Sequence, residues 1–424
     1  MKIAIVGTGI AGNVAAYQLR AEHDITVFEA GPYVGGHTNT IDVFESGRRI
    51  AVDTGFIVFN DRTYPNFIRI LDEIGQESQA SEMSFSVQAE GGGLEYGGSS
   101  LNALFAQRRN LLRPRFYRMI RDILRFNETT LPSVDHLDHS ESLGTYLREN
   151  DYSPEFKEHY LIPMAAAIWS AEPVSVLRMP VKFLVRFFAN HGLLQLKDRP
   201  TWRVIKGGSR EYVSRLVAGH DDCIRLNSPV ESVERFDDRV EVYTTSGGIE
   251  TFDYVFLACH SDQALRILKD ASSAERSVLG SIPYQRNEAV LHTDQSLMPK
   301  RRKAWAAWNY HLPQSPTAHV AVTYNMNILQ GLEAGDQYLV TLNNDRQIDP
   351  GKIIRTVEYE HPVFTRTSVA AQQRQRDLND DRTFYCGAYW RNGFHEDGVV
   401  SALDAVGHFE ERLSNGKLYL RRAS

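Results

Sequence analysis

The first 29 residues constrain the fold more than any other part of the chain. An apolar run, 2–6, leads into Gly7-Thr8-Gly9-Ile10-Ala11-Gly12, and a second apolar run, 24–28, ends at Glu29. A GxGxxG turn between a strand and a helix, with an acid ending the next strand, is the pattern of a dinucleotide-binding βαβ unit. The glycines let the backbone approach a pyrophosphate at the helix N-terminus, and Glu29 would accept the ribose hydroxyls. The sequence therefore predicts dinucleotide contacts at Gly7, Gly9, Ile10, Ala11, Gly12 and Glu29.

A second glycine pair follows and indicates which dinucleotide is bound. After Ala30 the chain reads Gly35-Gly36-His37-Thr38, and later Gly55-Phe56. This pattern resembles the extended flavin fingerprint of the amine oxidase and phytoene desaturase superfamily. In that superfamily a Gly-Gly-Arg turn lies along FAD, whereas His37 stands here in place of the arginine. The resemblance implies FAD as cofactor, with all of these residues in contact with it.

The C-terminal part supplies the matching half of the fingerprint. Residues 382–386 read as a strand, Gly387 as a turn, and 393–400 as the start of a last helix. The resemblance implies that this helix points its N-terminus at the flavin, where the helix dipole favours negative charge. It also implies that Val230 flanks the adenine and that Ala258 passes the pyrophosphate. The remaining implied contacts are Gly387, Tyr389, Trp390, Glu396, Asp397, Gly398 and Val399. Since no cysteine stands where the superfamily forms a thioether, FAD is expected to be non-covalent.

The spacing of these motifs predicts how the chain is divided. A chain of 424 residues is too long for one core. The predicted fold class is α/β (α+β), a Rossmann-like FAD-binding domain of the amine oxidase type with an inserted mixed-sheet and helical substrate domain. The FAD-binding domain is expected at 1–75, 200–280 and 379–424. The substrate domain is expected at 76–199 and 281–378, with 101–196 mainly helical.

Composition and charge exclude several functions. A net charge of −6 does not suit nucleic-acid binding, and the sequence lacks an apolar stretch of membrane-spanning length. Cys223, Cys259 and Cys386 are few, far apart and odd in number, which favours a reducing, cytoplasmic compartment without disulfides. His136 and His139 lie in an acidic turn, and no histidine or cysteine pair has metal-ligand spacing, so no metal is predicted.

One predicted helix has a strongly basic face. Residues 101–126 hold seven arginines and one aspartate. From 115 to 127 the apolar side chains Phe116, Met119, Ile120, Ile123 and Leu124 recur at helical spacing, opposite Arg115, Arg118, Arg121 and Arg125. This face is either an ordinary solvated surface or a site that docks on an anionic membrane. In the second case the protein would be peripheral on the inner face of the membrane.

Candidate substrate contacts come from the two insertions. Aromatic strands place Trp305, Trp308, Tyr310 and Tyr324 where the floor of a substrate cavity is expected, although sheet packing alone also favours such residues. The apolar segment 183–196 would line an acyl-sized tunnel at Leu194, or would simply be core. Tyr389 and Trp390 follow the predicted flavin turn and are expected to lie beside the ring.

Further motifs narrow the resemblance. Residues 167–170, 291–294, 304–310, 361–364 and 393–398 are similar to a bacterial subfamily of amine oxidase-fold flavoproteins. Its genes commonly neighbour cyclopropane fatty acyl synthases, and it is similar to the flavin domain fused before such synthases in plants. This resemblance implies a lipid or acyl-chain substrate by association.

A missing lysine bears on the reaction. Amine oxidases usually hold a water at the flavin with a strand lysine, but no lysine lies between Lys269 and Lys300, and Ala289 falls near that place. We therefore expect an FAD-dependent oxidoreductase that oxidises or desaturates an acyl chain, with His292, His395 and Glu396 as candidate proton handlers. Three alternatives stay open: a flavin amine oxidase, an FAD-dependent fatty acid double-bond isomerase, and a non-catalytic flavoprotein partner of a lipid methyltransferase.

Overall fold

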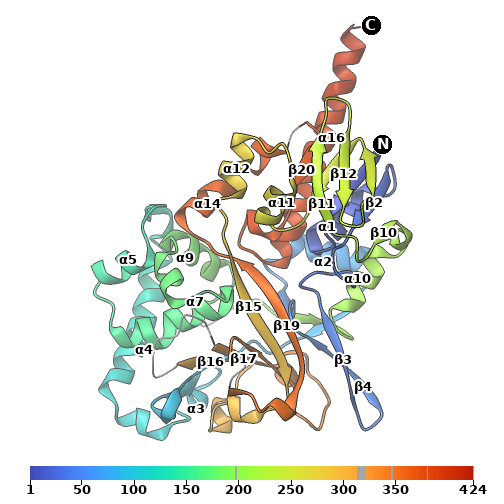
Figure 1. The fold of residues 1–424 in the computed structure, drawn as a ribbon. Coiled ribbons are helices and arrows are strands. Elements are labelled where there is room, and N and C mark those ends of the chain that lie inside the picture. The colour runs from blue at the N-terminus through green and yellow to red at the C-terminus, as the bar shows by residue number, and fades with distance from the viewer. Residues whose placement is uncertain (196–197, 313–320, 345–346, 380, 424) are drawn as a thin grey trace.

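The computed structural model describes residues 1–195, 198–312, 321–344, 347–379 and 381–423. In Figure 1 the upper part holds a parallel sheet and both chain ends, and the lower part holds a larger mixed sheet with helices beside it. The upper sheet has five parallel strands, and four of them are short, largely buried apolar runs, as is usual for a parallel sheet covered on both faces. Its order is β10 (Ile224–Arg225), β2 (Asp24–Phe28), β1 (Lys2–Val6), β14 (Tyr254–Leu257) and β20 (Thr383–Tyr385).

Helices cover this parallel sheet. α1 (Ile10–Leu19) starts directly after the glycine turn and packs against α16 (His395–Ala423), the long helix that rises from the top of Figure 1. The strands come from all three pieces predicted to form the FAD-binding domain. However, β6 (Ser78–Ala80), which the predicted boundaries assign to the substrate domain, pairs with β9 (Trp202–Ile205) of the other domain. The exact division into domains remains a prediction.

The lower sheet is mixed and has seven strands. Its order is β19 (Ile353–Pro362), β15 (Tyr284–His292), β18 (Leu339–Leu342), β17 (Ala321–Asn325), β16 (Trp308–Leu312), β7 (Phe85–Ala89) and β8 (Glu95–Gly97). Only β16 and β7 pair in parallel among these neighbours. The sheet thus joins residues 85–97 to residues 284–362, so both insertions contribute to it.

The first insertion is mainly helical between residues 101 and 195; Leu196, the last residue of the range expected to be helical, lies outside the described residues. Ser100, Ser142 and Ser153 cap three of its helices by accepting a backbone N–H in the first turn. The helices are α3 (Leu101–Leu104), α4 (Pro114–Thr130), α5 (Leu143–Glu149), α6 (Pro154–Phe156), α7 (Ile162–Trp169), α8 (Pro173–Arg178) and α9 (Val181–Asn190).

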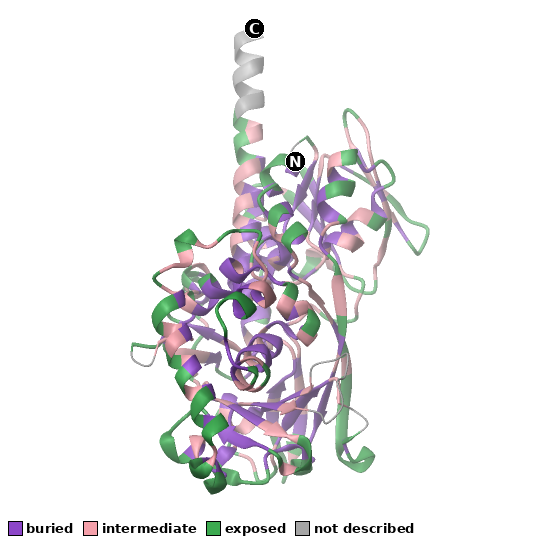
Figure 2. Cartoon of the chain, turned by 90° about the vertical axis from the view of Figure 1, so that its left-hand side faces the viewer, coloured by how far each residue is buried: buried purple, intermediate pink, exposed green. Residues whose placement is uncertain are grey.

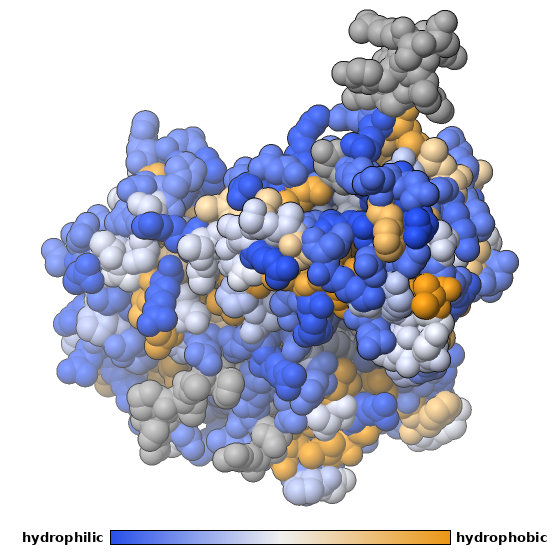
Figure 3. All heavy atoms as spheres, turned by 45° about the horizontal axis from the view of Figure 1, so that its top comes forward, coloured by the Kyte–Doolittle hydropathy of each residue, from blue (hydrophilic) through white to orange (hydrophobic). Residues whose placement is uncertain are grey.

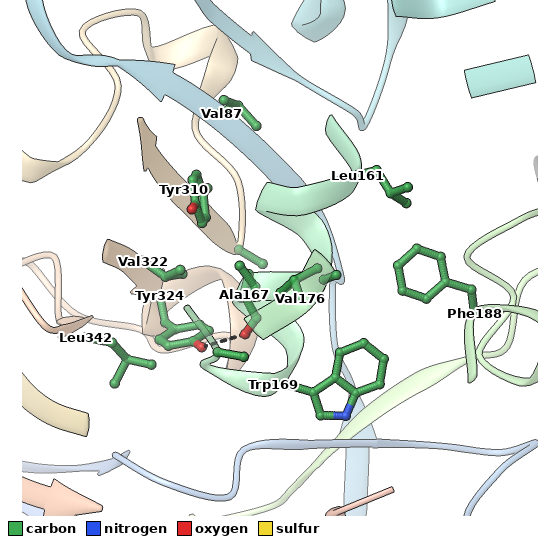
Figure 4. Packing of buried hydrophobic residues seen from close by; sticks show 14 of the residues in the cluster. Val87, Leu161, Ala167, Trp169, Val176, Phe188, Tyr310, Val322, Tyr324 and Leu342 are labelled. Carbon is green, nitrogen blue, oxygen red and sulfur yellow. Dashed lines mark hydrogen bonds between the residues drawn. The ribbon is translucent and has the colours of Figure 1, made fainter. Parts of the chain in front are cut away.

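The helices and the seven-stranded sheet share the largest hydrophobic core. Leu161, Trp169, Val176 and Phe188 from the helical side lie beside Tyr310, Val322, Tyr324 and Leu342 from the sheet (Figure 4). Each fully buried side chain of this size contributes about 1.5–3 kcal/mol to folding. Figure 2 shows the same division, with buried strands and helix faces inside and exposed helix faces outside.

Smaller elements complete the molecule. Three further sheets are β3 (Thr40–Glu45) with β4 (Arg48–Asp53), β6 and β5 (Val58–Asn60) on either side of β9, and β11 (Val230–Arg235) with β12 (Val240–Thr244) and β13 (Ile249–Phe252). The other helices are α2 (Pro65–Glu73), α10 (Arg210–Val217), α11 (Ser261–Ile267), α12 (Ser273–Leu279), α13 (Met326–Leu329), α14 (Arg366–Gln372) and α15 (Gln375–Leu378). Seen with its top brought forward, the surface is mostly hydrophilic with small separate hydrophobic groups (Figure 3).

The basic helix α4 differs in detail from its predicted face. Phe116 and Met119 are buried as expected, but Leu124 is 41% exposed, while Phe126 is fully buried. The buried stripe therefore lies slightly to one side of the predicted one. It includes Asp122, whose carboxylate accepts the backbone N–H of Ser153 at 3.0 Å. Within the described ranges, no helix is both long and apolar enough to cross a bilayer.

Candidate active site

A cavity of about 570 Å³ lies between the two large sheets. One end is formed by the carboxyl ends of β1 and β2 and by the turns that follow them, which is where parallel α/β sheets bind ligands. The other end is formed by β16, β17, β18 and the last turn of α7. The volume is within the usual range for cofactor and small-molecule sites.

The glycine turn after β1 forms the first wall. Gly7 has φ +105°, and a Cβ on Gly12 would lie 1.9 Å from the Gly7 carbonyl oxygen, so α1 can start here only with glycine at both positions. Gly9 is different, because a Cβ at this residue would meet no atom within 4 Å and would enter the cavity. Gly7, Gly9, Ile10 and Ala11 line the cavity, whereas Gly12 does not. Gly12 is a packing residue, and the prediction that it contacts the cofactor is corrected.

Glu29 is held at the end of β2. Its carboxylate accepts hydrogen bonds from the Thr8 hydroxyl, from the Thr8 backbone N–H at 3.0 Å and from the Gly31 N–H at 2.7 Å. Glu29 and Ala30 both line the cavity, as do Val230 and Ala258. The predicted acid therefore stands beside the glycine turn, in the position from which a ribose could be bound.

The second glycine pair continues the wall. Gly35 and Gly36 have φ +135° and +59°, and a Cβ on Gly36 would lie 3.1 Å from the Gly9 α-carbon. The two glycine turns are thus packed against each other, and Gly35, Gly36, His37, Gly55 and Phe56 all line the cavity. Thr38 does not. Its hydroxyl instead forms hydrogen bonds with the Tyr212 hydroxyl at 2.7 Å and the His395 ring at 3.0 Å. These bonds hold the Gly35-Gly36 turn on the side away from the cavity.

The C-terminal segment closes this end. Gly387 and Tyr389 line the cavity, and the Gly387 N–H donates to the Ser401 hydroxyl at 2.8 Å. Residues 392–395, at the start of α16, also line it, so the N-terminus of this helix borders the cavity. Trp390, Asp397, Gly398 and Val399 lie outside the lining. Gly398 allows close contact of α16 with α1, since its Cβ would lie 2.6 Å from Ile10, and Trp390 and Val399 are core residues.

The acids at the start of α16 have structural partners. Glu396 accepts the backbone N–H groups of Asn66 at 3.1 Å and Phe67 at 2.9 Å, so it caps α2. Asp397 accepts the Phe394 N–H at 2.8 Å, and burial raises the pKa of its carboxyl to about 6. Neither carboxylate lines the cavity. The predictions that Glu396 handles protons and that both acids contact the cofactor are therefore corrected.

The two predicted catalytic histidines lie in different places. His292 is buried within β15, bonded to the Thr341 hydroxyl at 2.7 Å and to the Asp294 N–H at 3.0 Å, and is not part of the cavity. Its prediction as a proton handler is corrected. His395 lines the cavity, stacked on Phe56 at 3.4 Å between ring centroids and bonded to the Tyr212 hydroxyl at 2.8 Å. Burial lowers the pKa of His395 to about 3, so its ring is neutral near pH 7.

A histidine cluster lines one side of the cavity and was not predicted, apart from His37. The His37 ring stacks on Tyr359 at 4.9 Å and meets His361 at 5.2 Å. His260 stacks on Tyr284 at 4.4 Å. Burial lowers the pKa of all three imidazoles, that of His361 to about 4. They are therefore neutral hydrogen-bonding groups, and His37 does not restore the positive charge of the arginine that it replaces.

The far end of the cavity is aromatic and aliphatic. Trp308 and Tyr324 face each other across β16 and β17, perpendicular at 5.0 Å, and Trp169 closes α7 beside them. The Trp169 indole donates to the Asn392 carbonyl at 3.2 Å, and the Tyr324 hydroxyl donates to the Ala167 carbonyl at 3.5 Å (Figure 4). The other lining residues at this end are Ile168, Ser170, Leu342, Phe364 and Phe394. Within the described ranges no lysine lines the cavity, and its aspartate and glutamate lining is Glu29 and Glu360.

Three predicted substrate contacts lie elsewhere. Tyr310 is on the same strand face as Trp308 but one pleat further along, buried among helices and sheet near Val87 and Val322 (Figure 4). Trp305 lies outside the strand, and its indole donates to the Pro299 carbonyl at 2.8 Å. Leu194 follows α9 and is buried in the core rather than in the cavity. The predictions for these residues are corrected, while Trp308 and Tyr324 do line the cavity.

The residues present fit a flavin dinucleotide. The open space at Gly9 and the paired glycine turns form a backbone cradle of the kind that admits a pyrophosphate. In the described part of the chain, four buried polar atoms of lining residues have no hydrogen-bond partner in the protein, namely His37 Nε2, His260 Nδ1, Trp308 Nε1 and Tyr389 OH. Such atoms need partners, which a bound polar ring system can supply. No cluster of metal ligands occurs among the described residues.

Comparisons with known proteins agree with this geometry. The sequence model described as flavin-containing amine oxidoreductase matches residues 10–318. No curated protein sequence matches the chain. Similar solved structures include cyclohexylamine oxidase from Brevibacterium oxydans IH-35A, with 16% identity, a TM-score of 0.68 and coverage of 97% of this chain and 99% of that one. A putrescine oxidase bound to putrescine has 15% identity, a TM-score of 0.67 and coverage of 97% and 99%. A CLA-producing fatty acid isomerase from P. acnes has 17% identity, a TM-score of 0.65 and coverage of 96% and 98%.

The structural likenesses, all at low identity, establish the fold, a Rossmann-like FAD domain with a mixed-sheet substrate domain. The sequence match covers most of the chain; it begins at Ile10, directly after Gly9, and includes Glu29 and the helices of the first insertion. The chain belongs to the flavin-containing amine oxidoreductase family and is an FAD-dependent oxidoreductase.

Proposed function

We propose that this enzyme oxidises or desaturates an acyl-chain or lipid substrate, as a member of the subfamily whose genes neighbour cyclopropane fatty acyl synthases. The proposal rests on the uncharged lining of the far end of the cavity. Its lining, from Ile168 and Trp169 to Leu342 and Phe364, contains no charged side chain in the described part of the chain. An apolar chain loses unfavourable contact with water there, whereas a charged group would be left unpaired.

The chemistry rests on the cofactor and on positioning. FAD, when bound, supplies the acceptor for a hydride from the substrate. The chain itself holds the substrate between Trp308, Tyr324 and Trp169 and excludes water from the reacting carbon. With Glu396 and His292 removed as candidates, His395 is the one proposed proton handler that lines the cavity. Its neutral imidazole is a weak base. It could accept a proton from the substrate only if its hydrogen bonds to the Thr38 and Tyr212 hydroxyls rearranged.

We propose further that FAD is held without a covalent bond. Cys259 lines the cavity, but burial raises the pKa of its thiol to about 12, so the reactive thiolate is not formed near pH 7. Cys386 is buried outside the lining, and burial raises the pKa of its thiol as well. The protein should therefore release FAD on denaturation.

An amine oxidase is the second candidate. The perpendicular pair of Trp308 and Tyr324 at 5.0 Å favours it, because aromatic walls also hold amines, and two similar structures are amine oxidases. The lining lacks the lysine expected of such enzymes in the described ranges. A fatty acid double-bond isomerase would use the same apolar end without net oxidation, as the name of the isomerase from P. acnes suggests for that protein. A stabilising partner of a lipid methyltransferase would need FAD but no turnover.

The test begins with lipid extracted from the purified holoenzyme and analysed by mass spectrometry. The holoenzyme is then incubated with methyl-branched, cyclopropanated and unsaturated fatty acyl phospholipids, and oxygen consumption and product mass are followed. Loss of two hydrogens from the lipid supports the proposal. A shifted double bond without loss of hydrogen indicates an isomerase, and no change in any lipid, with a stable complex with a lipid methyltransferase, indicates a partner protein.

A further inference from the structure

Exposed leucines gather at one end of the molecule. Of the thirteen large hydrophobic residues that are exposed in the described part of the chain, five lie between residues 101 and 124. Leu101, Leu111 and Leu112 are 78%, 46% and 87% exposed, around α3 and the short 3₁₀ helix η2 (Arg108–Leu112). This region lies at the bottom of Figure 1, at the opposite end from the free end of α16. Grouped exposed leucines are unusual for a surface that faces only water.

Basic side chains from two distant segments surround these leucines. Arg108 and Arg109 come from η2, and Lys300, Arg302 and Lys303 come from the turn at η7 (Arg302–Ala304); all five are exposed. The segments meet because a Cβ on Gly97 of β8 would lie 3.4 Å from Ala103 of α3 and 3.5 Å from the Ala304 carbonyl. We define the basic tip as Leu101, Leu111, Leu112, Arg108, Arg109, Lys300, Arg302 and Lys303.

The two arginines of the basic tip bond neutral groups of the protein. Arg109 donates to the carbonyls of Gly92 and Gly93, and Arg108 donates to Asn102 and the Phe105 carbonyl, so both cations use neutral acceptors. The buried carboxylate of Glu95 is bonded to Arg301, which is not counted in the tip. Glu90, in the turn before Gly92, is the acid of this neighbourhood that remains exposed.

The arginines of α4 are a less suitable docking surface than their sequence pattern indicates. Arg115 and Arg118 lie 3.7 and 3.8 Å from Glu155, and Arg125 lies 3.5 Å from buried Asp122 and over the Tyr152 ring. Their charge is partly neutralised within the protein. At the basic tip, by contrast, Arg108 and Arg109 bond neutral acceptors and lie beside the exposed leucines.

We propose that the basic tip docks on an anionic lipid bilayer. Leucines that project beside arginine and lysine side chains fit the boundary between acyl chains and headgroups, where apolar groups are buried and cations meet phosphates. Charge complementarity selects an anionic over a zwitterionic surface. Docking would be peripheral, because no described helix is long and apolar enough to span the bilayer. This inference does not depend on the substrate proposed above.

The proposal is tested by sedimentation of the full-length holoenzyme with vesicles. Vesicles of phosphatidylglycerol and phosphatidylcholine are compared with vesicles of phosphatidylcholine alone, at low and high salt. The wild type should bind the anionic vesicles and be released by salt. Reversing two tip charges, in Arg108→Glu/Lys303→Glu, should weaken partitioning by at least about tenfold, and Leu112→Ser should also weaken it.

Matched controls change the same chemistry elsewhere. Arg48→Glu/Arg276→Glu reverses two charges that are exposed on β4 and α12, and Ile249→Ser removes a hydrophobic residue that is 61% exposed on β13. Both controls should bind vesicles like the wild type, and every variant should retain the FAD absorbance. Equal binding by tip variants and controls, binding that ignores salt, or failure of the wild type to bind the anionic vesicles would overturn the proposal.

Discussion

The two ends of the cavity are built in different ways. The cofactor end is made of backbone, with paired glycine turns, and its residues are mostly grouped in short motifs between 7 and 56. The substrate end is made of side chains from α7, β16, β17 and β18 together with Phe364 and Phe394, which the fold brings together over some 200 positions. At the first end, Gly7, Gly12 and Gly35 have no room for an added side chain, whereas the second end is lined by side chains that can be changed one at a time.

The largest effect is expected at the packing glycine. Gly12→Val would place a Cβ 1.9 Å from the Gly7 carbonyl oxygen, backbone against backbone, with no flexible side chain to move away. Overpacking of this kind costs about 1–3 kcal/mol even where the surroundings can yield. We expect little soluble protein and no native near-ultraviolet circular dichroism. A folded, yellow Gly12→Val protein would show that the turn is less tightly packed than described.

Gly9 separates cofactor binding from folding. Its φ and ψ, −62° and 176°, suit valine, and a Cβ there would enter the open cavity. Gly9→Val should therefore fold like the wild-type apoprotein but contain no FAD, as measured by absorbance after heat release. Gly9→Ala should retain part of the flavin. Full flavin content in Gly9→Val would exclude this turn as the cofactor site.

The substrate end should respond without loss of the cofactor. Ile168→Trp would fill the space beside Trp169 and Trp308, and we expect turnover of an acyl lipid to fall about a hundredfold through misplacement of the reacting carbon. The FAD absorbance should be unchanged. Leu194→Met, a volume-conserving change in the core outside the cavity, is the control and should leave turnover within twofold or so of wild type. Equal losses in both variants would place the substrate elsewhere.

Buried histidines in both parts of the molecule predict that the free energy of unfolding decreases at acid pH. Burial lowers the pKa of His395 to about 3, and those of His361, His292 and His311 to about 4, below the ordinary 6.5. Between those values the unfolded chain binds more protons than the folded one. Each histidine's contribution to stability is therefore complete above pH 6.5 and declines as the pH falls, by up to about 1.4 kcal/mol per pH unit.

Variants can assign this slope to the two regions. His395→Gln should reduce the pH dependence of the unfolding free energy and also weaken FAD retention, because this ring stacks on Phe56 in the cavity wall. His311→Gln should reduce the slope alone, since this ring bonds Gln88 and Thr323 away from the cavity. Urea unfolding at pH 5.5 and 7.5 measures both slopes. A wild-type stability that rises on acidification in this range would contradict the assignment.

The difference between the cofactor end and the substrate end of the cavity also determines which residues can be predicted from the sequence alone. The glycine turn, Glu29 and Gly35 to His37 can be predicted because contacts to a dinucleotide impose fixed spacings on a short stretch of chain. In the sequence, Ile168 to Ser170 and His361 to Phe364 indicate only the family resemblance, although the fold brings residues of both segments into the cavity. Their role depends on which strands become neighbours, and no local pattern encodes that. For the same reason Tyr310 was misplaced, because strand alternation gives the face but not the distance along the strand.

The first residues of α16 show a second limit of prediction from sequence. Glu396, Asp397 and Gly398 stand where the superfamily pattern suggests cofactor contact, yet Glu396 caps α2 and Gly398 admits Ile10. A motif marks a segment as a unit and does not separate residues that touch the ligand from residues that position the helix. Separating them requires the contacts of each side chain.

The most direct test of the account is anaerobic mixing of the holoenzyme with defined substrates in a stopped-flow instrument. A methyl-branched or cyclopropanated acyl phospholipid should bleach the oxidised flavin absorbance, and the Ile168→Trp variant should bleach about a hundredfold more slowly. Cyclohexylamine and putrescine should leave the spectrum of both proteins unchanged. Rapid bleaching by either amine, together with no response to any acyl lipid, would contradict the proposed substrate class and favour an amine oxidase.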